Sequence, residues 1–227
     1  MMYIPYFSTA MAAIFTLAVF ARYLKKGGMH LLFWSVGMLL YTLSTATELV
    51  LTFTFNEWAL KIWYIAGAML VAAWLGQGTV HLLFRNGKTA IVLTYILVAL
   101  SALAIVLVFM APLTGGQAGY NVTHPASEQY KTILTRGGIT ILLTVLFNIY
   151  GTITLVGGAL YSAFLFWRKQ VLANRMFGNI LIAAGALSPA LAGTLIKAGM
   201  LDFLYLSDFL GASLMFIGFM LSTAGKE

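Results

Sequence analysis

Residues 137–167 read GGITILLTVLFNIYGTITLVGGALYSAFLFW and contain no Asp, Glu, Lys or Arg. Residues 1–21 are free of these charged side chains as well. A helix needs about 20 apolar residues to cross the roughly 30 Å hydrocarbon core of a bilayer. Both stretches reach that length, so they predict helices that cross a membrane.

The composition of the whole chain supports the same class. Of the 227 residues, 61% are hydrophobic and 8% are charged, whereas soluble domains carry about 25% charged residues. So few charges cannot cover a water-facing surface, and we therefore predict that the lipid bilayer is the main partner. The formal net charge of +7 comes from basic residues beside hydrophobic segments, where they face lipid headgroups, so we predict no binding to nucleic acid.

The breaks between apolar segments predict a single all-α domain over residues 1–227, a bundle of seven transmembrane helices. The separators are charged or glycine-containing, such as Lys25-Lys26-Gly27-Gly28 and Arg85-Asn86-Gly87-Lys88. A polar loop over 114–138 would lie across one end of the bundle. The predicted helices cover residues 4–24, 30–54, 59–83, 89–113, 139–166, 177–199 and 203–223.

The distribution of basic residues predicts the orientation. With the N-terminus outside and the C-terminus in the cytoplasm, nine of the 13 basic residues lie on the cytoplasmic side: Arg22, Lys25, Lys26, Arg85, Lys88, Arg168, Lys169, Arg175 and Lys226. The other four lie on the outer side: Lys61, Lys131, Arg136 and Lys197. Cytoplasmic ends of membrane helices are enriched in Lys and Arg, so this orientation is preferred.

Ionisable residues inside the predicted helices are the first candidates for function, because each costs several kcal/mol within a membrane. Glu48 lies about 9 Å below the outer end of its helix, at 1.5 Å per residue. Asp208 reaches a similar depth in the last helix, and Lys61 and Lys197 lie near that level in two others. The four residues predict a polar site that opens outward.

Polar stripes add two residues to this site. Tyr41, Thr45 and Glu48 share a helix face, Tyr64 follows Lys61 by three positions, and Asn148 follows Thr144 by four. The predicted ligand-binding residues are Glu48, Lys61, Tyr64, Asn148, Asp208 and Lys197. The alternative is that these residues form internal salt bridges, such as Glu48 with Lys61, which only hold helices together.

Small residues predict the faces on which helices pack closely. Ala68, Ala72 and Gly76 repeat at every fourth position. The fifth helix has Gly151, Gly157 and Gly158, and the seventh has Gly211 and Gly218, which predict similar contacts. Pro189 removes a backbone hydrogen bond from the sixth helix, where it predicts a kink.

We predict no catalytic residue, no metal site, no cofactor and no enzymatic activity. The chain has no cysteine and lacks the HExxH and GxSxG motifs. His30 and His81 on neighbouring helices could ligate a haem. Histidines at such interfacial positions more commonly face headgroups, however. A hydrolytic site is excluded, because Glu48 and Asp208 would lie about 20 Å from these histidines along the helices.

Residues 33–84 resemble the second and third helices of the seven-helix sensor domains of bacterial histidine kinases. The similarity comprises Trp34, Tyr41, Glu48, the segment Lys61-Ile62-Trp63-Tyr64, and Trp74. It implies a receptor-like sensor of signal transduction in a bacterial cytoplasmic membrane. Only Ser222–Glu227 follow the last helix, so a separate protein would have to receive the signal.

Three functions therefore remain open. The first is a receptor-like or sensory module that binds a small molecule from outside and signals through a protein partner in the membrane or cytoplasm. The second is a non-catalytic subunit of a larger membrane complex. The third is a small permease or ion pathway, although few polar residues continue toward the inner side.

Overall fold

The computed structural model is all-helical over the residues that it describes, which are 4–84, 88–115, 119–170, 173–197 and 202–223. Side chains are described within these ranges except at 190–197 and 202–204. Two long helices contain a π-helical segment, so each is one rod in three parts. The elements are α1 (Ile4–Lys26), α2 (Met29–Leu51), the rod α3–η1–α4 (Glu57–Trp63, Tyr64–Leu70 and Val71–Leu83), α5 (Lys88–Met110), α6 (Ala126–Ile133), the rod α7–η3–α8 (Gly138–Gly151, Thr152–Gly157 and Gly158–Arg168), α9 (Ala173–Lys197) and α10 (Asp202–Thr223).

Six of these helices are long and apolar enough to cross a membrane: 4–26, 29–51, 57–83, 88–110, 138–168 and 205–223. Their outer surfaces carry large apolar side chains, including Leu17, Tyr95 and Met110, and the last is 77% exposed. Such an extended apolar surface is unfavourable in water and is consistent with contact to a lipid bilayer.

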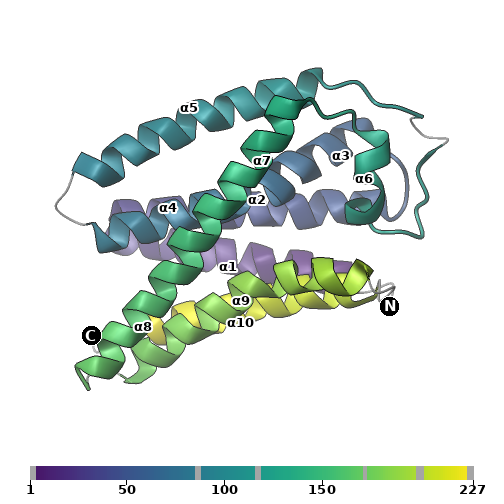
Figure 1. Ribbon diagram of the computed structural model, residues 1–227. Helices are drawn as coiled ribbons and strands as arrows, with labels where there is room; N and C mark the ends of the chain where they lie inside the picture. The colour runs from purple at the N-terminus through teal and green to yellow at the C-terminus, as the bar shows by residue number, and fades with distance from the viewer. Residues whose placement is uncertain (1–3, 85–87, 116–118, 171–172, 198–201, 224–227) are drawn as a thin grey trace.

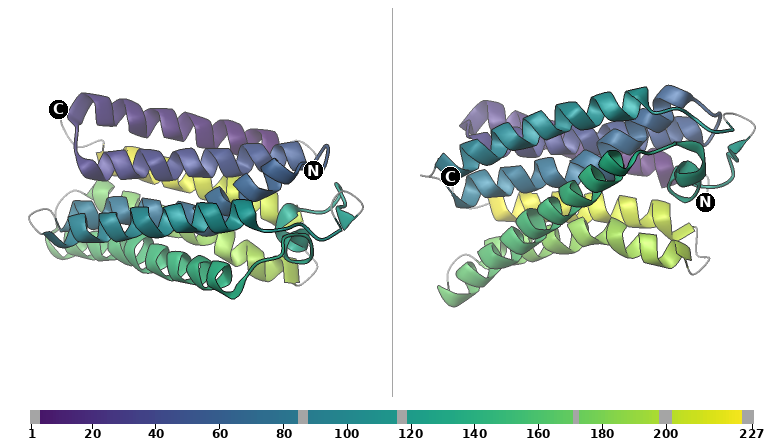
Figure 2. Two further views of the ribbon diagram at one scale, coloured as in Figure 1. Left: turned by 90° about the horizontal axis from the view of Figure 1, so that it is seen from above. Right: turned by 45° about the horizontal axis from the view of Figure 1, so that its top comes forward.

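The helices form a bundle with two sides. α9 packs along α10, α10 contacts α1, and α1 contacts α2, which in turn packs on α4 (Figure 1). The rod α7–η3–α8 crosses α4 and reaches α9 through α8, while α5 lies on the outer side of α4 (Figure 2). α6 lies at the same end of the bundle as the first turn of α1.

The observed helices follow the predicted ones closely, and local hydrogen bonds explain the shifted ends. α2 ends three residues earlier than predicted, and α3 begins two residues earlier. The side chain of Asn56 caps α3 by accepting a hydrogen bond from the Ala59 backbone N–H at 2.9 Å. The predicted end of the sixth helix at residue 199 lies outside the described residues.

The segment 114–138 is not the plain loop that the sequence predicted, because it contains α6. Ala126, Tyr130 and Ile133 follow one another at helical spacing, and Ala126 and Ile133 are buried in a cluster with Trp63 and Tyr64. An antiparallel bridge between Leu113 and Leu134 joins the two ends of the segment. The segment is polar overall, so its amphipathic pattern was not recognised from the sequence.

Glycines bring α9 and α10 into close backbone contact. A Cβ atom on Gly218 would lie 2.5 Å from the Gly178 carbonyl oxygen and 2.9 Å from the Ile182 backbone nitrogen. Gly151 packs against Ala72, which confirms the predicted small-residue face of the third helix. The prediction for Gly157 was wrong, because this glycine faces open space.

Gly218→Ala should destabilise the protein, because the added methyl group would push α9 away from α10. Overpacking of this kind costs about 1–3 kcal/mol. We expect a lower melting temperature for the purified variant in detergent, measured by intrinsic fluorescence. Gly157→Ala is the control and should melt at or slightly above the wild-type temperature. Equal melting of both variants would contradict the tight contact.

Candidate functional site

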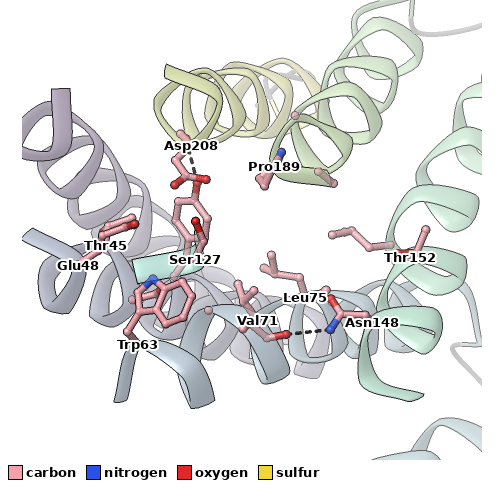
Figure 3. A pocket seen from close by; sticks show the side chains of 18 of the residues that line it. Thr45, Glu48, Trp63, Val71, Leu75, Ser127, Asn148, Thr152, Pro189 and Asp208 are labelled. Atoms are coloured by element: carbon pink, nitrogen blue, oxygen red, sulfur yellow. Dashed lines mark hydrogen bonds between the residues drawn. The ribbon is translucent and has the colours of Figure 1, made fainter. Parts of the chain in front are cut away.

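A pocket of 760 Å³ lies between α2, the rod α3–η1–α4, the rod α7–η3–α8, α9 and α10. Its walls combine polar and apolar side chains, and α6 contributes Ser127, Glu128, Tyr130 and Lys131. Figure 3 shows side chains from these different helices around one hollow. The volume is within the range of about 300–1,000 Å³ that is typical of small-molecule sites.

Glu48 and Asp208 are the acidic residues on the inner wall of the pocket, supplied by α2 and α10. Glu48 is 5% exposed, and the two carboxyl groups are close enough to interact electrostatically. Among the described residues the ion pairs are Lys61 with Glu57 and His124 with Glu128. Neither carboxyl group of the wall therefore has a basic partner in this part of the structure.

The Glu48 carboxyl group is also incompletely hydrogen-bonded. Trp63 is its hydrogen-bonding neighbour, yet Oε1 has no partner within the described part of the chain. The Ser127 hydroxyl group of α6 lacks a partner there as well. Buried polar atoms are rarely left without a partner; the other such atoms among the described residues, on Arg136, Arg175 and Ser222, belong to side chains outside the pocket lining.

Aromatic side chains occupy the same wall. Tyr41 donates a hydrogen bond from its hydroxyl group to the Asp208 carbonyl oxygen at 2.8 Å, which links α2 to α10 (Figure 3). Trp63 is 7% exposed and contacts the ring of Tyr130. The acidic groups therefore lie beside the aromatic rings of Tyr41 and Trp63.

Both π-helical segments line the pocket. Gly67 and Ala68 come from η1, and Thr152 and Leu155 come from η3. Asn148 donates a hydrogen bond to the Ala68 carbonyl oxygen at 2.8 Å and so ties the second rod to the first. π-Helical turns occur often at functional sites because they interrupt regular packing.

α6 covers one end of the pocket and is held there by cation–π contacts between Arg136 and two tyrosine rings. The Arg136 guanidinium lies 4.8 Å from the centre of the Tyr130 ring and 5.8 Å from that of Tyr64. Burial is the main cause that raises the pKa of Tyr130. Burial also raises the pKa of Tyr120 to about 12, with a further contribution from the negative charge of Glu48. The cover is therefore packed against the pocket rather than detached from it.

The structure brings together three of the six predicted site residues. Glu48, Asn148 and Asp208 line the pocket. Tyr64 is fully buried and shares a 2.8 Å hydrogen bond with Thr144, and it is not among the lining residues. The side chain of Lys197 lies outside the described residues.

Lys61 has a different environment from the predicted one. It is 4% exposed and pairs with Glu57 at 2.7 Å rather than with Glu48. Its ammonium group also donates to the Phe109 carbonyl oxygen at 3.1 Å, at the end of α5. Lys61 therefore connects α3 to α5.

A second polar cluster connects α4 to α5 and lies outside the pocket lining. Gln77 is fully buried and donates to the Ala90 carbonyl oxygen at 2.9 Å and to the Thr94 hydroxyl group at 2.8 Å. The Tyr150 hydroxyl group donates to Gln77 in turn. His81 shares a 2.8 Å hydrogen bond with Thr94. The polar groups of these residues are hydrogen-bonded to one another, so the cluster is a structural contact between helices.

The absence of a metal site and of a haem stays a prediction from the sequence. No group of three or more His, Cys, Asp or Glu side chains gathers within the described residues. The ring of His81 stacks on Phe33, and that of His30 lies beside Gly28.

Sequence reasoning missed two residues of the site. Trp63 was noted only as part of a family resemblance, and Ser127 lay in the supposed loop. The helical spacing of Ala126, Tyr130 and Ile133 could have revealed α6, and with it Ser127.

Lys61→Met should lower stability without affecting the pocket, because the Phe109 carbonyl oxygen would lose its donor. An unsatisfied buried polar group costs about 1–3 kcal/mol, so we expect a lower melting temperature in detergent. Glu57→Gln is the matched control. Its amide oxygen can still accept from Lys61 and the position is half exposed, so the change should stay below about 1 kcal/mol. Unchanged melting of Lys61→Met would contradict this structural role.

Known proteins give no assignment for this pocket. No family model matches the chain, and the comparisons with curated proteins and with solved structures find no significant match either. Evidence for function comes from the residues, contacts and burial of the pocket.

Proposed function

We propose that this chain is a receptor-like membrane module that binds a small molecule in the pocket beneath α6 and signals through a separate protein. The observation that carries the proposal is the Glu48 carboxyl group, which is buried, faces a pocket of 760 Å³ and leaves Oε1 without a partner among the described residues. A polar group of this kind is costly in a membrane. A bound molecule would offset that cost.

The proposal includes seven membrane-spanning helices, with α9 added to the six that are long and apolar enough to cross a membrane. α9 has 25 residues and is about 37 Å long at 1.5 Å per residue. The excess of basic residues favours an outside N-terminus and a cytoplasmic C-terminus. α6 then covers the outer end of the bundle. The similarity of residues 33–84 to bacterial sensor domains supports a bacterial cytoplasmic membrane.

A receptor explains the polar residues better than a permease does. A permease needs polar side chains that continue from the pocket toward the opposite end of the bundle. Gln77 and His81 lie in that direction, but they bond to α5 and are not pocket-lining residues. The described polar residues therefore favour a closed site over a pathway.

Single cysteines should test the topology, since the chain has no native cysteine. Thr132→Cys on α6 and Lys169→Cys after α8 both occupy exposed positions. In intact cells we expect a membrane-impermeant maleimide to label Thr132→Cys only, and Lys169→Cys to react after permeabilisation. The reverse pattern would mean that the N-terminus is inside, and labelling of both would contradict the seven-helix topology.

Filling the pocket should abolish ligand binding. Ala186 of α9 lines the pocket, whereas Ala102 is exposed on α5, which makes Ala102→Trp a matched control. A panel of cationic, neutral and anionic small molecules is screened for compounds that raise the melting temperature of the purified chain. We expect at least one compound whose effect is lost in Ala186→Trp and retained in Ala102→Trp.

The same compound should change the arrangement of the helices if the chain is a receptor. Spin labels at Ile153→Cys and Leu187→Cys, both at exposed positions, report the separation of η3 from α9. A binder that leaves this distance unchanged would contradict signalling. A panel without any compound that depends on Ala186 would contradict small-molecule binding itself.

A further inference from the structure

We infer that the pocket selects a small organic ammonium ion with an apolar body. This inference rests on the proposed function and deepens it, because it assigns the chemical class of the ligand. Four features of the pocket support it. They are the unpaired carboxyl groups, the aromatic and apolar walls, the free hydrogen-bond acceptors, and a rim whose acid is already paired.

The inner wall carries two carboxyl groups that form no ion pair with a basic side chain of the described residues. Glu48 and Asp208 line the same pocket and lie close enough to interact. The basic side chains that form ion pairs, Lys61 and His124, are bonded to other acids. Breaking or omitting one partner of a buried ion pair is strongly destabilising. A cation in the pocket would supply the missing partner.

The surrounding rings and apolar groups favour an organic cation. Tyr41 and Trp63 line the wall beside the acids, and Tyr130 covers it from α6. Faces of Trp and Tyr attract ammonium groups electrostatically. Val71, Leu75 and Met215 also line the pocket and provide contacts for the apolar body of such a ligand.

The free acceptors agree with an ammonium group. Oε1 of Glu48 and Oγ of Ser127 are buried and lack partners among the described residues. Both can accept a hydrogen bond from an N–H donor. A bare Ca²⁺ ion would instead need about six to eight oxygen ligands, and the described residues bring no three acidic or histidine side chains together. The pocket volume also far exceeds that of a single ion.

The rim of the pocket adds basic as well as acidic groups, because Arg136 lies over the Tyr130 ring there. Glu128 lines the rim but pairs with His124 at 2.9 Å, and both side chains are exposed. Lys131 lies beside it, with its ammonium group 5.9 Å from the Tyr130 ring centre. Selection for a cation must therefore come from Glu48 and Asp208, and Glu57, an acid of α3 outside the pocket lining, is a suitable control position.

Binding is measured by calorimetry on the purified full chain in detergent, near neutral pH. The probes are phenethylammonium and benzyltrimethylammonium, the neutral 2-phenylethanol, the anionic 3-phenylpropionate, and Na⁺. We expect saturable binding of the two ammonium ions. The Kd of the neutral and anionic probes should be at least tenfold higher. This comparison needs no variant and is independent of folding effects.

Variants then locate the charge that selects the cation. Asp208→Asn and Glu48→Gln keep the shape of each side chain, and each should weaken ammonium binding at least tenfold. Glu57→Gln removes the same charge outside the pocket lining and should change the affinity less than twofold. Melting curves of all three variants confirm that they are folded.

The outcomes separate this inference from the proposed function. Equal binding of phenethylammonium and 2-phenylethanol, unaffected by Asp208→Asn and Glu48→Gln, would overturn the ammonium assignment and leave a small-molecule pocket in place. Binding of Na⁺ alone would overturn it in favour of an inorganic ion. Absence of binding by every probe would overturn it as well. If the panel also contained no compound that depends on Ala186, the proposed function would be lost too.

Discussion

Hydrocarbon offers no hydrogen bonds, so each polar group inside a membrane helix must find its partner within the protein. The described helices meet this constraint repeatedly. The Lys61 ammonium group bonds to Glu57 and to the end of α5, and Gln77 is bonded to α5 and Tyr150. Asn148 bonds to a carbonyl oxygen of η1. Against this background Oε1 of Glu48 and Oγ of Ser127, which lack partners among the described residues and belong to pocket-lining side chains, draw attention to the pocket.

The pocket exists because regular packing is interrupted where the two rods meet. η1 and η3 each place residues on its wall, and the wider π-helical turn shifts side chains from the positions that a continuous α-helix would give them. Asn148 holds the two rods together beside the pocket. At one end α6 covers the space, and the stack of Arg136 on Tyr130 and Tyr64 keeps it there.

The sequence was sufficient to predict the helices and part of the site, for physical reasons that also limited it. Charge-free runs specify membrane helices because the bilayer has a fixed thickness. Position along a helix specifies depth, which is why Glu48 and Asp208 were identified, and the polar stripe that begins at Thr144 identified Asn148. Depth does not specify the direction of a side chain, however. Lys61 is close to the predicted level, but it points to Glu57 and α5. α6 was missed because its buried side has only a few apolar residues within a polar segment.

The same contacts suggest how an occupied pocket would move the bundle. Asp208 belongs to α10, and Gly185 and Pro189, which line the same pocket, belong to the neighbouring helix α9. These two helices meet backbone to backbone at Gly218 and Gly178, and again at Gly211 and Gly185. Because such close contacts leave no room for sliding side chains, a ligand that draws Asp208 inward would carry α9 along with α10. The pair would then move as a unit against α7 and η3, so the proposed signal would reach the proposed partner protein through one end of the α9–α10 pair.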